Sequence, residues 1–141
     1  MSEEEGPLPR NATPFDAYKA IIDQCVDKTN NYGYQHFVRK HGFFSRAPDH
    51  AEYNAFIKSL SRTQVEMLAE MLRHERYSAV HDVLALLSWW IDCWDVALTY
   101  RGEPMPAGVE GGMHNDYVGR LDGWQWPKEA PPEGGDASGE H

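Results

Sequence analysis

The sequence predicts an all-α domain: a compact bundle of four or five helices around one central hydrophobic helix, closed by an irregular, Trp-containing C-terminal arm. Three observations predict this class. Apolar residues recur every three or four positions through most of the 141-residue chain, the spacing that gathers side chains on one helix face. Residues typical of helix starts precede these runs. The segment near the C-terminus is rich in Gly and Pro yet apolar, which favours an ordered arm over a long helix.

Both ends of the chain are expected to be flexible tails. Residues 1–12 and 128–141 contain scarcely any apolar side chain that could anchor them. The tails also carry much of the formal net charge of -9. Residues 13–127 then form a single helical domain, which is long enough to bury a core of ordinary size.

The first helix is expected to begin at Thr13. Thr13 is a favoured capping residue, Pro14 takes the first helical position, and Asp16 places an acid in the first turn. A shorter helix is expected within residues 32–42, because Gly42 is a typical helix terminator.

Two further helices are expected to follow. Asp49 with Glu52, and Thr63 with Glu66, both have the spacing of a capping box at the start of a helix. The apolar pattern is interrupted at residues 74–78, where either a tight turn or a kink fits the sequence.

The next helix, over residues 78–100, is expected to be the centre of the bundle. Apolar residues cover most of its circumference: Val80, Val83, Leu84, Leu86, Leu87, Trp89, Trp90, Ile91, Trp94 and Leu98. A helix that is apolar nearly all round is typically packed on several sides. We therefore expect its tryptophans to be buried.

One polar seam interrupts this apolar surface. At about 100° per residue, five side chains project within roughly 40° of a common direction: His81, Ala85, Ser88, Asp92 and Asp95. Asp92 and Asp95 lie one turn apart and can hold a divalent cation if both are desolvated. Surface acids are much more common than buried ones, so contact with water is the preferred interpretation.

Residues 102–127 are expected to form an ordered arm across the bundle, with one or two helical turns within 115–121. A hairpin also fits residues 101–106. Arg120 is expected to pair with a carboxylate, and Trp124 and Trp126 to anchor the arm. Two Trp near a Pro also suit a partner-binding surface, and this alternative stays open.

Two blocks of the chain resemble a family of small uncharacterised bacterial proteins. The first, VEMLAEMLRHERYSAVHDVLALL, spans residues 65–87, and the second, DYVGRLDGWQWP, spans 116–127. The strongest matches include His81, Asp82, Asp116, Tyr117, Arg120, Gly123, Trp126 and Pro127. Family members tend to carry an acidic pair before the final Trp-Pro, where this chain has Trp124 and Gln125. The resemblance implies a helical fold and a bacterial origin, without an established activity.

The net charge and the hydropathy of the chain argue against two classes of partner, nucleic acids and membranes. Neither the whole chain nor its body is basic, which argues against nucleic acid and anionic membrane surfaces. No apolar run reaches the roughly 18 to 20 residues that cross a bilayer. A secretory signal begins with basic residues and continues with an apolar run. The first twelve residues are acidic and contain no such run, so they do not resemble a secretory signal. We expect a cytoplasmic protein.

The adjacent His81 and Asp82 invite comparison with metal-dependent phosphohydrolases that use a His-Asp pair on a helix. Those enzymes need a further His and Asp, and a chain with seven His offers such sets by chance. Local hydrogen bonding is the preferred interpretation. Motifs for a phosphate loop, a nucleophile elbow or a zinc protease are missing from the sequence, and we assign no metal ligand, cofactor or catalytic residue.

A dense positive cluster stands out in this acidic chain. His36, Arg39 and Lys40, followed by His41 and Arg46, suit phosphate or an acidic partner. The wet face of a short helix explains such a cluster equally simply and is preferred.

The leading function hypothesis is a small cytoplasmic bacterial binding or accessory protein that acts through protein contacts, without catalysis. Self-association into a homo-oligomer is kept as part of this hypothesis. Candidate binding residues are His81, Asp82, Ser88, Asp92, Asp95, Asp116, Tyr117, Arg120, Trp124 and Trp126. The alternative is a metal-dependent hydrolase that uses His81 with Asp82, or Asp92 with Asp95.

Overall fold

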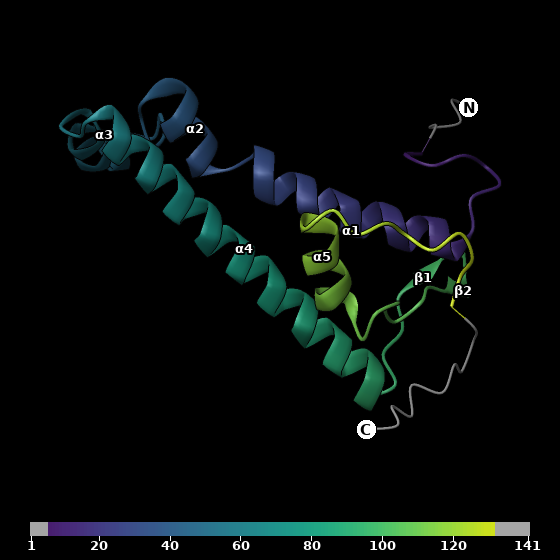
Figure 1. Ribbon diagram of the computed structural model, residues 1–141. Coiled ribbons are helices and arrows are strands. Elements are labelled where there is room, and N and C mark those ends of the chain that lie inside the picture. Colours follow the sequence, from purple (N-terminus) through teal and green to yellow (C-terminus); the bar gives the residue numbers. More distant parts are fainter. Residues whose placement is uncertain (1–5, 132–141) are drawn as a thin grey trace. The chain divides into compact units, whose positions relative to one another are not determined.

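The computed structural model describes residues 6–131 and is mostly helical (Figure 1). The helices are α1 (Pro14–Asn31), α2 (Tyr34–His41), the short 3-10 turn η1 (Pro48–His50), α3 (Ala51–Lys58), α4 (Arg62–Cys93) and α5 (Met113–Leu121). Within the described residues, the strands β1 (Thr99–Tyr100) and β2 (Glu103–Pro104) form one small antiparallel ladder. The predicted all-α class is confirmed. The predicted tails lie partly outside the described residues.

The chain divides into two compact units, which are described separately. The terminal unit comprises the described residues up to Cys25 and from His81 onward, and the middle unit comprises Val26–Val80. Residues of α1 and α4 belong to both units. In the part of the chain that the structure describes, no helix combines the length and apolarity needed to cross a bilayer.

The predicted start of α1 is confirmed. The backbone N–H of Asp16 donates to Thr13 Oγ1 at 3.1 Å, and the N–H of Thr13 donates to Asp16 Oδ2 at 3.0 Å. These reciprocal bonds are a capping box, which satisfies donors that the first turn leaves free. The hydrogen bonds from Thr13 lower the pKa of Asp16. The following residues Phe15, Tyr18 and Ile22 form the buried face of the helix.

The middle unit has its own small core. Val38 of α2, Ile57 of α3 and Ala69 of α4 are buried together, and Phe44, Val65, Leu68 and Leu72 pack against them. Helix α2 ends as predicted at Gly42, whose left-handed φ of 70° is a conformation that Gly adopts easily. The predicted cap at Asp49 is wrong, because Asp49 lies within η1 and no side chain caps α3.

Helix α4 decides one open alternative and corrects two expectations. It is one continuous helix of 32 residues, so residues 74–78 form no turn. Its capping box is formed by Ser61 with Gln64, at 2.9 and 3.2 Å, rather than by Thr63 with Glu66. It also ends at Cys93, well before Tyr100, so the last part of the expected central helix is irregular or strand.

The C-terminal half of α4 is much less covered than expected. Leu84 and Ser88 are buried, whereas five apolar side chains in or just after this half are exposed: Val83, Leu86, Trp89, Trp90 and Trp94. The expectation that its tryptophans are buried is therefore wrong. A helix that is apolar nearly all round does not reveal which side faces the core, and here the polar Ser88 is on the covered side.

The segment after α4 contains a short hairpin and the helix α5. Thr99 pairs with Pro104 and Tyr100 with Glu103, so the hairpin suggested by the sequence forms. The two turn residues have the positive φ angles that a tight hairpin turn requires. The helical turns expected within 115–121 extend over Met113–Leu121 as α5.

Candidate functional site

A buried carboxylate holds the arm of the terminal unit in place. Asp116 is fully enclosed. It accepts the backbone N–H of Val109 at 2.8 Å and that of Glu110 at 2.9 Å, and the Tyr18 hydroxyl also donates to it. Burial, followed by the hydrogen bond and the charge of Asp116, raises the pKa of Tyr18 far above its ordinary value. Asp116 therefore joins α1, α5 and the preceding loop.

A second contact of the terminal unit joins the end of the arm to α1. Arg120 donates to both carboxylate oxygens of Asp23, from Nε at 2.7 Å and Nη2 at 3.3 Å, and Trp126 Nε1 donates to Asp23 at 3.1 Å. The Trp126 ring also meets Tyr18 edge to face, with ring centres 5.8 Å apart. The prediction that Arg120 pairs with a carboxylate and the prediction that Trp126 anchors the arm are both confirmed.

The polar seam of α4 is divided between the protein interior and solvent. The buried Ser88 Oγ accepts the backbone N–H of Met113 at 2.9 Å, at the start of α5. His81 meets His114 edge to face at 5.4 Å between ring centres, and its Nδ1 lies 3.2 Å from Asp82 Oδ1. The N-terminal part of the seam therefore contacts the arm.

The C-terminal part of the seam does not form the pair suggested by the sequence. Asp92 and Asp95 are both exposed. Asp95 follows the end of α4 and has a φ of 56°, so the two carboxylates are not one helical turn apart. Within residues 6–131, no group of three or more His, Cys, Asp or Glu side chains is arranged to hold a metal ion.

The outer side of the same helix half forms an apolar surface, which we call the Trp face. It consists of Val83, Leu86, Trp89, Trp90 and Trp94. The three Trp side chains are 48%, 44% and 57% exposed, respectively. Their rings contact one another, with centres 5.6 Å apart for Trp89 with both others and 6.3 Å apart for Trp90 with Trp94. The sequence pattern singles out these residues but places them in the core.

Acidic residues accompany the Trp face on its own stretch of the chain. Asp82, Asp92 and Asp95 are all exposed. The sequence contains no Lys or Arg between Tyr77 and Tyr100. The face is therefore apolar at its centre and negative at its edge.

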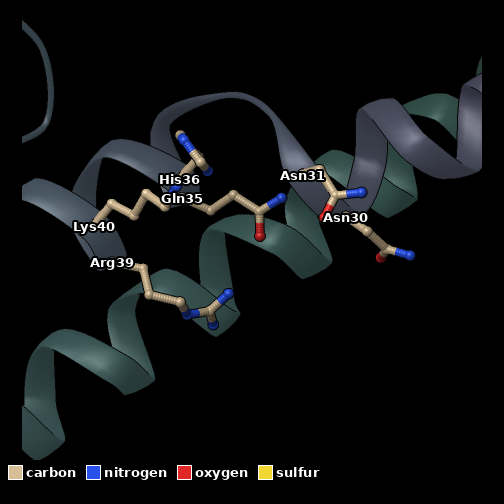
Figure 2. A pocket seen from close by; sticks show the side chains of 6 residues that line it. All are labelled: Asn30, Asn31, Gln35, His36, Arg39 and Lys40. Atoms are coloured by element: carbon tan, nitrogen blue, oxygen red, sulfur yellow. The ribbon is translucent and has the colours of Figure 1, made fainter.

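The middle unit contains a polar cavity of about 420 Å³ (Figure 2). It is lined by Asn30, Asn31, Gln35, His36, Arg39 and Lys40. The three anion candidates from the sequence thus share one cavity. Asn30, Asn31 and Gln35 are not predicted from the sequence, although Gln35 lies one helical turn before Arg39.

Gln35 is the most enclosed member of this cavity, at 1% exposed. Its Nε2 donates to the carbonyl oxygens of Thr29 and Tyr32, near the end of α1. Its Oε1 is buried and has no hydrogen-bond partner among the described residues. Arg39 reaches Glu66 at 3.2 Å and Glu70 at 3.5 Å through exposed ion pairs. The lining of the cavity therefore combines two bases and His36 with a Gln side chain whose buried oxygen has no partner among the described residues.

Comparison with protein families identifies a relationship over most of the chain. Residues 11–128 match the model of a family of unknown function, DUF6547. The chain belongs to this family. The matched region includes both units apart from the ends of the chain, and every candidate residue discussed above. Searches of curated proteins and of solved structures gave no match.

Proposed function

We propose that this protein is a small cytoplasmic bacterial binding or accessory protein, without catalysis, that contacts a partner protein through its Trp face. The observation that carries the proposal is the exposure of Trp89, Trp90 and Trp94 next to one another. Trp is strongly enriched among the residues that dominate binding energy at protein interfaces. Such clustered exposure is a burden for a protein that binds nothing, because it favours aggregation.

The size of the Trp face suits a contact of moderate strength. A Trp side chain has up to about 250 Å² to bury, so three half-exposed rings present about 300–400 Å². At about 25 cal/mol per Å², their burial gives about 8–10 kcal/mol before the cost of association. That cost is about 4–15 kcal/mol. The Trp face therefore needs additional contacts at its edge.

The charge at the edge indicates the chemistry of the partner. A partner with apolar anchors surrounded by Lys or Arg would pair with Asp82, Asp92 and Asp95. A second copy of this chain would instead bring two sets of acids together. We therefore commit to a basic amphipathic helix of another protein as the occupant, and self-association becomes an outcome of the test.

A designed peptide tests this proposal, whichever protein the natural partner is. The probe is a helical peptide with Leu and Phe at helical spacing and Lys and Arg on either side, and its control replaces those bases by Glu. We expect the basic peptide to bind and to shift the Trp fluorescence to shorter wavelength. Trp90→Glu should weaken binding at least tenfold. Met71→Glu, a matched change at an exposed position of α4 in the middle unit, should leave it unchanged.

Three results would overturn the proposal: no saturable binding of the basic peptide, equal binding of its Glu counterpart, or unchanged binding by Trp90→Glu. Measurement of the solution mass adds a fourth. If the wild type is a dimer and the Trp90→Glu variant is a monomer, the Trp face binds a second copy of the chain instead of a basic partner.

A further inference from the structure

Beyond protein contact, we propose that the cavity between the end of α1 and α2 binds a small sugar phosphate. The phosphate would lie against His36, Arg39 and Lys40, and a hydroxyl of the sugar would donate to Gln35 Oε1. This site belongs to the middle unit alone and does not depend on the Trp face.

The charge of the middle unit supports an anionic ligand. Residues 26–80 contain eight Lys and Arg against six Asp and Glu, whereas the whole chain has a net charge of -9. The cavity gathers two of these bases with His36. Within the described residues, Lys40 forms no ion pair, so its charge is available to a ligand.

The geometry of α2 directs these groups to one place. Arg39 and Lys40 follow His36 by three and four positions, so all three side chains lie on the same side of the helix. Figure 2 shows Lys40 extending back along α2 toward Gln35, the direction that helix geometry gives to such a side chain. The guanidinium of Arg39 lies over α4, where it pairs with Glu66 and Glu70. Because Gln35 and Arg39 lie one turn apart on one side of α2 and line the same cavity with Lys40, we place the phosphate of the ligand near the two bases and its hydroxyl near Gln35.

Gln35 indicates that the ligand must also donate a hydrogen bond. Its amide nitrogen is committed to the carbonyls of Thr29 and Tyr32, so its orientation is fixed and Oε1 remains as an acceptor. Buried polar atoms in folded proteins nearly always have a partner, and an exception needs an explanation. Within the described residues no donor reaches this oxygen, and in our proposal a hydroxyl of the ligand supplies one. A bare anion would leave it unused.

Phosphate suits the bases better than a carboxylate does. A phosphate monoester carries a charge of about -1.5 to -2 at neutral pH and three acceptor oxygens, and Arg can bind two of them together. The pairs of Arg39 with Glu66 and Glu70 are exposed and compete weakly. Gln35 and Arg39 are one turn, about 6 Å, apart along the helix. A sugar that carries a hydroxyl at one end and a phosphate at the other spans this distance. The cavity volume lies in the range of ordinary ligand sites.

Calorimetric titration of the full chain with ribose 5-phosphate, inorganic phosphate and ribose tests the proposal. We expect ribose 5-phosphate to bind at least tenfold more tightly than inorganic phosphate, and ribose to show no binding. Lys40→Gln and Arg39→Gln should each weaken the binding of ribose 5-phosphate about tenfold. Lys58→Gln, which removes an exposed base of α3 outside the cavity, should leave it unchanged.

The proposal is overturned if ribose 5-phosphate shows no saturable binding below about 10 mM, or if the Arg39 and Lys40 variants bind it as the wild type does. It is also overturned if inorganic phosphate binds equally well, because Gln35 then has no role in recognition. Binding of the basic peptide to the Trp face is measured separately, so failure of either proposal leaves the other interpretable.

Discussion

Replacement of Asp116 by Ala is expected to destabilise the terminal unit strongly. The change removes the acceptor shared by Tyr18, Val109 and Glu110. The Tyr18 hydroxyl is enclosed and Val109 is half-buried, whereas Glu110 is exposed and its N–H can turn to water. Each enclosed donor without a partner costs about 1–3 kcal/mol. One enclosed donor and one half-buried donor together give a loss of about 1–4 kcal/mol from the free energy of unfolding, because the half-buried N–H of Val109 recovers part of its hydrogen bonding from water.

Urea unfolding, followed by circular dichroism and extrapolated to water, measures this loss. The matched control is Asp122→Ala, because Asp122 is an exposed acid at the end of α5, where a change of at most about 0.5 kcal/mol is expected. Tyr18→Phe removes the hydroxyl that Asp116→Ala leaves unpaired. The double variant should therefore lose less stability than the two single losses added together.

Two results would refute this reasoning. A loss below about 1 kcal/mol for Asp116→Ala would mean that the buried carboxylate does not hold the arm. Strict additivity in the double variant would mean that Tyr18 and Asp116 are not coupled.

Three further predictions concern pH, the start of α1 and metals. The pKa of Tyr18 is raised on folding, so its contribution to stability is complete below about pH 10 and is lost as pH rises further. Tyr18→Phe should therefore flatten the loss of stability that pH titration of urea midpoints shows above about pH 10. Thr13→Ala should cost about 1 kcal/mol of unfolding free energy by urea titration, because the capping box is lost, whereas a cost near zero would contradict that role. Elemental analysis of purified protein should find no stoichiometric zinc, manganese or iron, and metal that is lost on His81→Ala would instead support the hydrolase hypothesis.

The parts of the fold that depend on neighbouring residues can be predicted from the sequence. The cap at Thr13 and Asp16 and the terminator Gly42 are predicted correctly, because each acts within one turn of chain. Competing local signals are harder to separate. Ser61 with Gln64 and Thr63 with Glu66 have similar cap patterns two residues apart, and in the structure the first pair forms the cap.

The buried side of α4 could not be predicted from the sequence. Apolar residues surround this helix, so periodicity alone gives no preferred face. Ser88 is buried because the distant Met113 N–H gives its hydroxyl a partner, and no rule of spacing links these two residues. With Ser88 on the buried side of the helix, Trp89, Trp90 and Trp94 are exposed to solvent.

Site residues that lie on one helix can be predicted together from their spacing, whereas residues from separate segments cannot. The spacing on α2 predicts that His36, Arg39 and Lys40 act together, and they share the cavity. Asn30 and Asn31 come from the end of α1 and escape prediction, because their place beside α2 depends on the connection between the helices. The pairing of Asp92 with Asp95 assumes a helix that continues past Cys93, where α4 ends.

The most direct test of the proposed role uses the five Trp side chains as separate reporters. Their indole N–H signals, assigned through single Trp→Phe variants, are followed by NMR while the Lys- and Arg-flanked peptide is added. We expect the signals of Trp89, Trp90 and Trp94 to shift, while those of Trp124 and Trp126 stay in place. Shifts confined to Trp124 and Trp126 would contradict the proposed role.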